Sequence, residues 1–173
     1  MPNQAAVTKS TDSVIRKFVD KEIQPQVSAL KVQLTKSQDD PRYRNSLGLV
    51  YARYGRYDEA LVEFLAVLKK TEYIPALINT GNINFLQGDF AKAIKLYDRV
   101  LARNDQNMAA LPGSAHCNFE LENYGSARKA YQTIQSVDPT LAQQFAFLAL
   151  EGDATTRASD AQAVKTIVAW EGD

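Results

Sequence analysis

The chain has 173 residues, of which 45% are hydrophobic, and its 20 Lys and Arg residues balance 20 Asp and Glu residues. A chain of this length buries enough apolar surface to fold as one domain without disulfides or a metal. The neutral balance argues against a nucleic-acid partner, because such binding rests largely on basic residues that neutralise phosphates. No apolar run approaches the roughly 20 residues that a membrane-spanning helix needs, so membrane insertion is not expected either.

The cysteine content and the first residues bear on the compartment. Cys117 is the only cysteine, which excludes an internal disulfide and favours a reducing compartment such as the cytoplasm. The first residues, Met1-Pro2-Asn3-Gln4, lack the basic start of a secretory signal, and no uninterrupted apolar stretch follows. A domain excised from an exported protein would look the same, so the compartment stays open.

Residues 1–10 are small and polar and are expected to form a disordered tail. Residues 11–40 are predicted to form two short capping helices. Apolar residues at helical spacing mark the first helix, namely Val14, Ile15, Phe18, Val19 and Ile23, and the second helix, namely Val27, Leu30 and Leu34. Pro25 is expected to separate the two helices, and Asp39 or Asp40 can cap the helix that follows.

From Pro41 onward, small and aromatic residues return at intervals of 33 or 34 positions. The small residues are Gly48, Gly81 and Ala115, and then Ala60, Ala93 and Ala127. The aromatic residues are Tyr57, Phe90 and Tyr124, and then Phe64, Tyr97 and Tyr131. A period of this length is typical of stacked helical hairpins. We expect the small residues to let the two helices of a hairpin approach closely, and the second aromatic set to fill the core between hairpins.

The turns inside the hairpins have signals of their own. Gly55 and Gly88 are expected to end the first helix of a hairpin in the left-handed conformation that glycine adopts most easily. In the third hairpin Glu122 replaces this glycine, so we expect either a different turn or a left-handed Asn123. The dipeptide at 112–113, Pro-Gly, falls inside the expected first helix of the third hairpin, where the proline either occupies the first turn or kinks the helix.

These residues resemble the tetratricopeptide repeat, whose pattern contains L-G-x2-Y, then A-x3-F, and then P. Leu47, Gly48, Tyr51, Ala60 and Phe64 match that pattern in the first hairpin. The resemblance implies an all-α fold, a right-handed superhelix of antiparallel helical hairpins, with three repeats over residues 41–73, 74–107 and 108–140. We call the first helix of each repeat its A helix and the second its B helix.

Residues 141–173 are predicted to form a degenerate C-terminal repeat that caps the array. The stretch 141–150 is typical of an A helix, and Gly152 stops it. A second helix is expected from the apolar spacing of Ala158, Ala161, Val164, Ile167 and Val168. Trp170 is expected to pack on this terminal face.

No group of residues predicts catalysis or a cofactor. His116, the only histidine, neighbours Cys117, but adjacent residues of a helix point about 100° apart and cannot readily pair as base and nucleophile. Cys117 is therefore expected to be a core thiol. No H-E-x-x-H, C-x-x-C or phosphate-binding glycine loop occurs in the sequence, so no metal, no cofactor and no enzymatic activity are expected.

The resemblance also implies a binding surface, because in this family the A-helix residues that face away from the B helices line a concave groove. The matching residues are Arg42, Asn45, Leu49 and Arg53 in repeat one, Asn79, Asn82, Phe85 and Leu86 in repeat two, and His116 and Phe119 in repeat three. Asparagine amides can bind the backbone of an extended peptide. Phe85 and Phe119 are expected to offer apolar pockets, and Arg42 and Arg53 to favour an acidic or carboxyl end. An ordinary solvated groove is the alternative.

Members of the family that bind chaperone tails hold the terminal carboxylate in a clamp of asparagine and basic side chains. Here Leu49 replaces one of those asparagines, and Ala109 and Gly113 stand where basic residues are needed. Binding of chaperone tails is therefore not expected. The leading hypothesis is a protein-interaction module that captures a peptide or helix of a protein partner in the groove. The alternative is a structural role, in which the N-terminal helix or the terminal hairpins assemble a homo-oligomer, or the N-terminal helix folds into the groove and occludes it.

Overall fold

The computed structural model describes residues 4–37, 40–149 and 168–172. Within these ranges the chain is helical and contains no strand. The elements are, in chain order, α1 (Gln4–Lys36), α2 (Pro41–Arg53), α3 (Tyr57–Leu68), α4 (Ile74–Leu86), α5 (Phe90–Leu101), α6 (Leu111–Glu120), α7 (Tyr124–Val137), α8 (Pro139–Gln144) and the 3-10 helix η1 (Ala146–Ala149). None of these helices is long and apolar enough to span a membrane.

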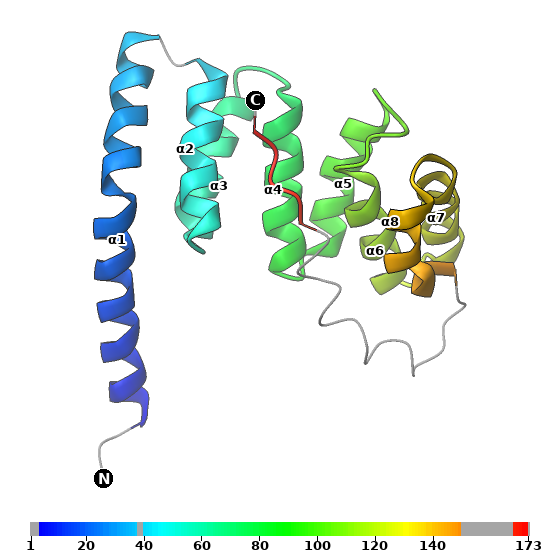
Figure 1. Cartoon of the computed structure of the whole chain (residues 1–173), viewed down its shortest axis with the longest axis horizontal. Helices are drawn as coiled ribbons and strands as arrows, with labels where there is room; N and C mark the ends of the chain where they lie inside the picture. Colours follow the sequence, from blue (N-terminus) through cyan, green and yellow to red (C-terminus); the bar gives the residue numbers. More distant parts are fainter. Residues whose placement is uncertain (1–3, 38–39, 150–167, 173) are drawn as a thin grey trace.

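Three antiparallel helix pairs stack side by side (Figure 1). They are α2 with α3, α4 with α5, and α6 with α7, and each pair packs against the next. The long helix α1 covers one end of the stack, and α8 with η1 covers the other. The prediction of an all-α, right-handed superhelix of three hairpins with degenerate helical caps is confirmed.

Small residues lie where large rings meet the A helices. A Cβ atom added at Gly48 would lie 2.4 Å from the Phe64 ring, and one added at Gly81 would lie 2.8 Å from the Tyr97 ring. One added at Gly113 would lie 2.7 Å from the same tyrosine ring, so Tyr97 fills the space between repeats two and three. This contact explains the glycine inside helix α6, and Pro112 occupies the first turn of that helix.

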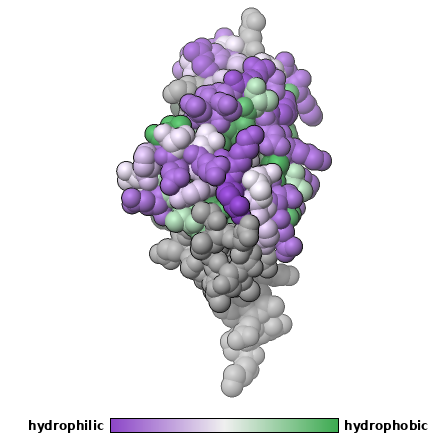
Figure 2. All heavy atoms as spheres, turned by 90° about the vertical axis from the view of Figure 1, so that its right-hand side faces the viewer, coloured by the Kyte–Doolittle hydropathy of each residue, from purple (hydrophilic) through white to green (hydrophobic). Residues whose placement is uncertain are grey.

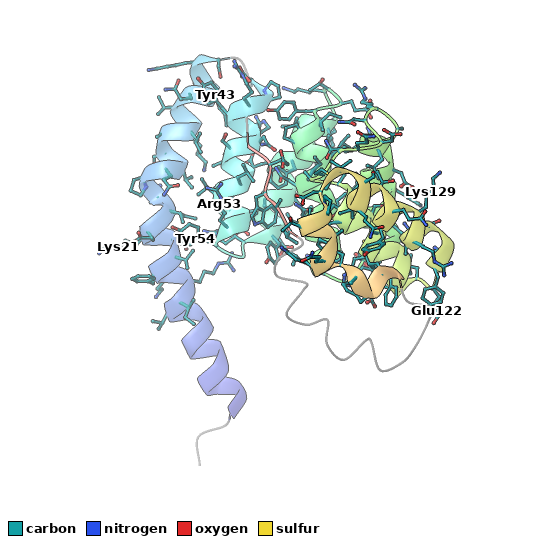
Figure 3. All side chains as sticks on the ribbon, turned by 45° about the vertical axis from the view of Figure 1, so that its right-hand side comes forward. Lys21, Tyr43, Arg53, Tyr54, Glu122 and Lys129 are labelled. Carbon is teal, nitrogen blue, oxygen red and sulfur yellow. The ribbon has the colours of Figure 1, made fainter. Side chains whose placement is uncertain are left out.

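The three hairpin turns keep one backbone conformation. Gly55 and Gly88 have φ angles of 73° and 79°, as expected. Glu122 has a φ of 62°, whereas Asn123 has a φ of −81°. The expectation of a different turn or a left-handed Asn123 is therefore wrong, because the glutamate itself takes the left-handed position. Its side chain is exposed at the end of the molecule opposite α1 (Figure 3), so the strain there is confined to the backbone.

Helix α1 is a single helix of 33 residues, so the expectation of two short helices separated at Pro25 is wrong. It begins at Gln4, inside the stretch expected to be a disordered tail. Proline has no backbone N–H, so the hydrogen bond to the carbonyl four residues earlier, that of Lys21, is missing. Both Pro25 and Lys21 are exposed, so water can satisfy that carbonyl, while Ile23 and Val27 stay buried against the first repeat.

The C-terminal end differs from the expected fourth repeat. Helix α8, whose first turn is capped by Asp138, ends at Gln144, and η1 follows it. Val168 lies in a non-helical segment, so the expectation of a helix there is wrong, and the other residues of that expected helix lie outside the described residues. The face at this end of the stack shows mainly hydrophilic residues with small apolar areas between them (Figure 2), as a capping end of an array requires.

Candidate functional site

A short non-helical segment, residues 168–172, lies along helix α4 on the side that the A helices present (Figure 1). Ala169 is bonded to Asn82, and Glu171 is bonded to Asn79. Residue numbers rise along the segment as they fall along α4, so the two run antiparallel. Three asparagines hold the segment, Asn45 on α2 and Asn79 and Asn82 on α4, and together they are called the asparagine site.

Two of these asparagines converge on one residue of the segment. Asn79 Nδ2 donates to the Glu171 carbonyl oxygen at 2.8 Å, and Asn79 Oδ1 accepts from the Glu171 N–H at 2.9 Å. Asn45 Nδ2 donates to the same carbonyl at 3.0 Å, and its own Oδ1 accepts from Asn79 Nδ2 at 3.0 Å. Both polar groups of the Glu171 backbone are therefore satisfied by amides that also hold each other in place.

The third asparagine is oriented from inside the core. Asn82 Nδ2 donates to the Ala169 carbonyl at 2.8 Å, while Asn82 Oδ1 accepts from the Tyr97 hydroxyl at 2.8 Å. Burial raises the pKa of Tyr97 far above its usual range, so this hydroxyl stays protonated and donates. Because the hydroxyl engages the amide oxygen, the amide nitrogen must face the segment.

The segment adds apolar contacts on alternate residues. Trp170 packs against the core formed by α1, α2, α3 and part of α4, and Val168 packs against the core of repeats two and three. Ala169 and Gly172 are exposed. The expectation that Trp170 packs on a terminal hairpin is therefore wrong, since it lies against the opposite half of the molecule.

The asparagines themselves are enclosed. Asn45 and Asn79 are 0% exposed and Asn82 is 2% exposed. Buried amides need hydrogen-bond partners, and here the backbone of residues 168–172 supplies them. The segment that covers these residues is C-terminal in sequence, whereas the N-terminal helix, expected as a possible cover, packs beside α2.

The apolar residues expected in the groove belong to the core. Phe85 and Phe119 are 3% and 2% exposed, so the expectation that they offer open pockets is wrong. Phe85 packs edge-on against His116 at 5.1 Å between ring centroids, and Phe119 packs against Phe147 of η1 at 5.6 Å. Two further residues of the expected groove, Leu49 and Leu86, also pack into the hydrophobic cores.

The two expected arginines lie at the ends of α2. Arg42 pairs with Asp40, the N-cap of the helix, at 2.7 Å, and its hydrogen bonds lower the pKa of that carboxyl. Arg53 is exposed in the last turn, next to Tyr54 (Figure 3). Neither position is an enclosed part of the asparagine site.

His116 and Cys117 are built into helix α6 as core residues. His116 is 2% exposed, and its Nε2 lies 3.2 Å from the Glu120 carboxylate. Burial, with a smaller contribution from Glu120, raises the pKa of Cys117 to about 12. The thiol is therefore neutral and enclosed, as a core residue would be. Among the described residues, no group of His, Cys, Asp and Glu could hold a metal ion.

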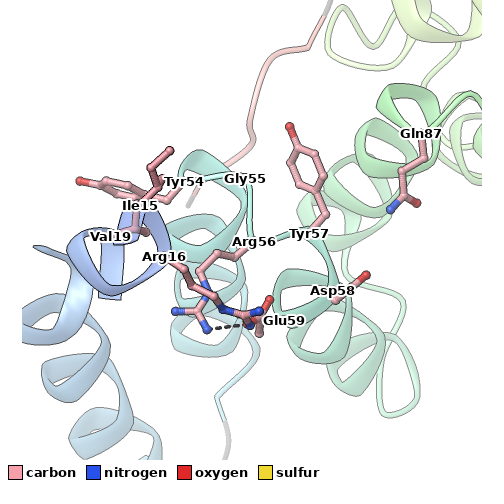
Figure 4. A pocket seen from close by; sticks show the side chains of 10 residues that line it. All are labelled: Ile15, Arg16, Val19, Tyr54, Gly55, Arg56, Tyr57, Asp58, Glu59 and Gln87. Atoms are coloured by element: carbon pink, nitrogen blue, oxygen red, sulfur yellow. Dashed lines mark hydrogen bonds and ion pairs between the residues drawn. The ribbon is translucent and has the colours of Figure 1, made fainter. Parts of the chain in front are cut away.

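A hollow of about 440 Å³ lies away from the asparagine site, between α1 and the turn after α2. Arg16 and Arg56 converge there on Glu59 (Figure 4). Arg56 also pairs with Asp20 and lies over the Tyr51 ring. The Arg56 hydrogen bond lowers the pKa of Glu59. These pairs attach α1 to repeat one, and the helical periodicity of the sequence carried no signal for them.

The fold and the inner face define a helical-repeat array, and two family models identify it further. Both are described as tetratricopeptide repeat, and they match residues 28–73 and 84–150. The chain belongs to the tetratricopeptide repeat family. Proteins of this family generally mediate protein–protein interactions, and they are typically non-enzymatic scaffolds.

The chain is also similar to individual known proteins. Over 87 residues the chain is 31% identical to Protein CTR9 homolog of Arabidopsis thaliana, which corresponds to 49% of this chain and 8% of that protein. A tetratricopeptide repeat protein from Parabacteroides merdae superposes with a TM-score of 0.67 at 21% identity, covering 92% of this chain and 63% of the other. A structure of MamA gives 0.66 at 20% identity and covers 88% of both chains. At this level of sequence identity, the two structural similarities show a shared fold alone.

Proposed function

We propose that this chain is a non-enzymatic interaction module that binds an extended segment of a protein partner in the concave groove of its repeats, through the asparagine site. The observation that carries the proposal is the set of four hydrogen bonds from Asn45, Asn79 and Asn82 to the backbone of residues 168–172. An extended peptide leaves its N–H and C=O groups unpaired along its length, and each asparagine amide carries a donor and an acceptor.

The arrangement of the site supports binding. Asn79 and Asn45 orient each other, and the buried Tyr97 hydroxyl orients Asn82. Side chains already held in the bound geometry lose little conformational entropy when a peptide arrives. Because the hydrogen bonds reach only backbone atoms of the segment, they place no requirement on the side chains of the bound peptide.

The test uses a fluorescein-labelled peptide with the sequence of residues 164–173, added to the full chain carrying Trp170→Ala so that the chain's own segment is weakened. We expect saturable fluorescence anisotropy, and a loss of affinity of about tenfold or more when Asn79→Ala is added, because two backbone hydrogen bonds disappear. Asn84→Ala is the matched control, since Asn84 lies on the same helix and bonds to the Thr80 carbonyl within it. Binding that is absent, or indifferent to Asn79→Ala, contradicts the proposal.

A second candidate function, self-association through α1, is favoured by one observation. Val14, Ile15 and Phe18 are 63%, 55% and 68% exposed, and they lie close together on α1, the helix at the outer end of the stack (Figure 1). Exposed apolar side chains on one helix face are typical of interaction surfaces. Sedimentation velocity over a range of concentrations tests it, with Phe18→Glu expected to abolish association and Gln26→Glu, on an exposed position of the same helix, to leave it. A monomer at every concentration contradicts this candidate.

A further inference from the structure

We propose that residues 168–172 are the built-in ligand of the asparagine site, and that an external partner binds by displacing them. The inference rests on the proposed function and deepens it, because the segment also defines the class of ligand. That ligand is an extended stretch of backbone, antiparallel to α4, with apolar side chains at two alternate positions.

The direction follows from the order of the contacts. Asn82 holds residue 169, and Asn79, one helical turn earlier on α4, holds residue 171. Asn79 bonds both the N–H and the C=O of Glu171. A peptide that runs in the opposite direction would exchange the positions of these groups and lose that pairing.

The side-chain preference follows from what the segment buries. In an extended chain, residues i and i+2 lie on the same face. Val168 and Trp170 occupy such positions and pack on the two hydrophobic cores, whereas Ala169 between them is exposed. The site therefore selects apolar residues at the positions of 168 and 170 and tolerates substitution at the position of 169.

Competition follows from burial and from tethering. Without the segment, Asn45 and Asn79 would keep each other but lose their bonds to Glu171, and the face that the segment now covers would be open to water or to another peptide. A segment on the same chain also acts at an effective concentration on the order of millimolar. A free peptide of equal intrinsic affinity thus binds the intact chain much more weakly than it binds an emptied site.

Trp170 reports on the segment directly, since it is the only tryptophan. In the full chain we expect tryptophan emission at shorter wavelength than that of the free 164–173 peptide. Asn79→Ala should move it toward the free-peptide value, and Asn84→Ala should not. Saturating amounts of a 164–173 peptide carrying Trp170→Phe should produce the same red shift in the unmodified chain.

Two results would overturn the inference. One is emission from the native chain that equals that of the free peptide. The other is emission that shifts on dilution over about a hundredfold range of concentration, because an intramolecular contact does not depend on concentration whereas a contact between copies does.

The labelled 164–173 peptide separates this inference from the function it rests on. We expect the Trp170→Ala chain to bind it about tenfold or more tightly than the unmodified chain does. Equal, Asn79-dependent binding to both chains would leave the peptide-binding function standing and refute displacement. No binding to either chain, with Trp170 emission still blue-shifted and sensitive to Asn79→Ala, would refute the function and leave the built-in contact.

Discussion

Repeats two and three place different residues at the same inner positions of their A helices. With the 34-residue spacing, Asn79 corresponds to Gly113 and Asn82 to His116. In repeat two these positions hold the backbone of another segment through amides. In repeat three the glycine accommodates the Tyr97 ring, and the histidine joins an aromatic cluster. Equivalent positions of one fold therefore carry buried amides in repeat two and a closed core in repeat three.

The aromatic cluster shows how the inner face is closed in repeat three. Phe147 of η1 lies 5.6 Å from the ring of His116 and 5.6 Å from that of Phe119, measured between centroids, and both contacts are edge-on. Edge-to-face contacts at this distance are favourable for aromatic rings. The inner face of repeat three is therefore covered by an aromatic ring of η1, whereas that of repeat two is covered by the backbone of residues 168–172.

The largest expected effect tests the role of Tyr97 as the joint between these two repeats. Tyr97→Ala should lower the free energy of unfolding by about 3–5 kcal/mol, because it empties the space against Gly81 and Gly113. Tyr131→Ala, at the equivalent and only half-buried position of repeat three, should cost about half as much. Urea unfolding followed by circular dichroism measures both, and equal losses would remove the distinction between the repeats.

Tyr97→Phe isolates the hydroxyl that orients Asn82. We expect a loss of about 1 kcal/mol in the free energy of unfolding, because one buried hydrogen bond disappears. The amide of Asn82 can then turn, so the 164–173 peptide should bind the Trp170→Ala chain about fivefold more weakly. Fluorescence anisotropy measures the affinity, with Tyr131→Phe as the control that should leave it unchanged. Unchanged affinity in Tyr97→Phe would mean that Asn82 is oriented by other contacts.

Much of the repeat core could be predicted because its packing is periodic. Ala60, Ala93 and Ala127 recur at one position and are all 0% exposed. The unbroken helix at Pro25 could not be predicted in the same way, since it depends on which side of the helix meets solvent. An interrupted pattern in sequence does not show where water can replace a lost hydrogen bond.

Of the candidate site, the asparagines could be predicted from the sequence, but the segment bound to them could not. The asparagines could be identified because the A-helix positions follow from the repeat. Their occupant could not, because the four hydrogen bonds reach backbone atoms, which every residue possesses. The place of Trp170 depends on the path of the chain before it, which helical spacing does not determine.

The turns offer a smaller contrast between the first two repeats and the third. Gly88→Ala should lower the free energy of unfolding by about 1 kcal/mol, since the new Cβ would meet no atom within 4 Å and only the left-handed backbone is strained. Glu122→Gly should instead stabilise the chain, by up to about 1 kcal/mol. Thermal unfolding of both variants tests this, and a destabilised Glu122→Gly chain would show that the glutamate side chain stabilises its turn more than its backbone strains it.

The smallest expected effect concerns the opposite end of the array, where apolar side chains and ion pairs, and not aromatic rings, attach the capping helix. The pKa of Glu59 is lowered by Arg56, so its stabilisation is complete above the ordinary glutamate pKa of about 4.3 and is lost as the pH falls through the lower folded value. Glu59→Gln should therefore be less stable than the unmodified chain by about 0.5–1 kcal/mol near pH 7, with the difference shrinking on acidification. Urea unfolding at several pH values measures the difference. A difference that stays constant with pH would mean that Glu59 contributes through packing, and the two ends of the array would then be attached by the same kind of contact.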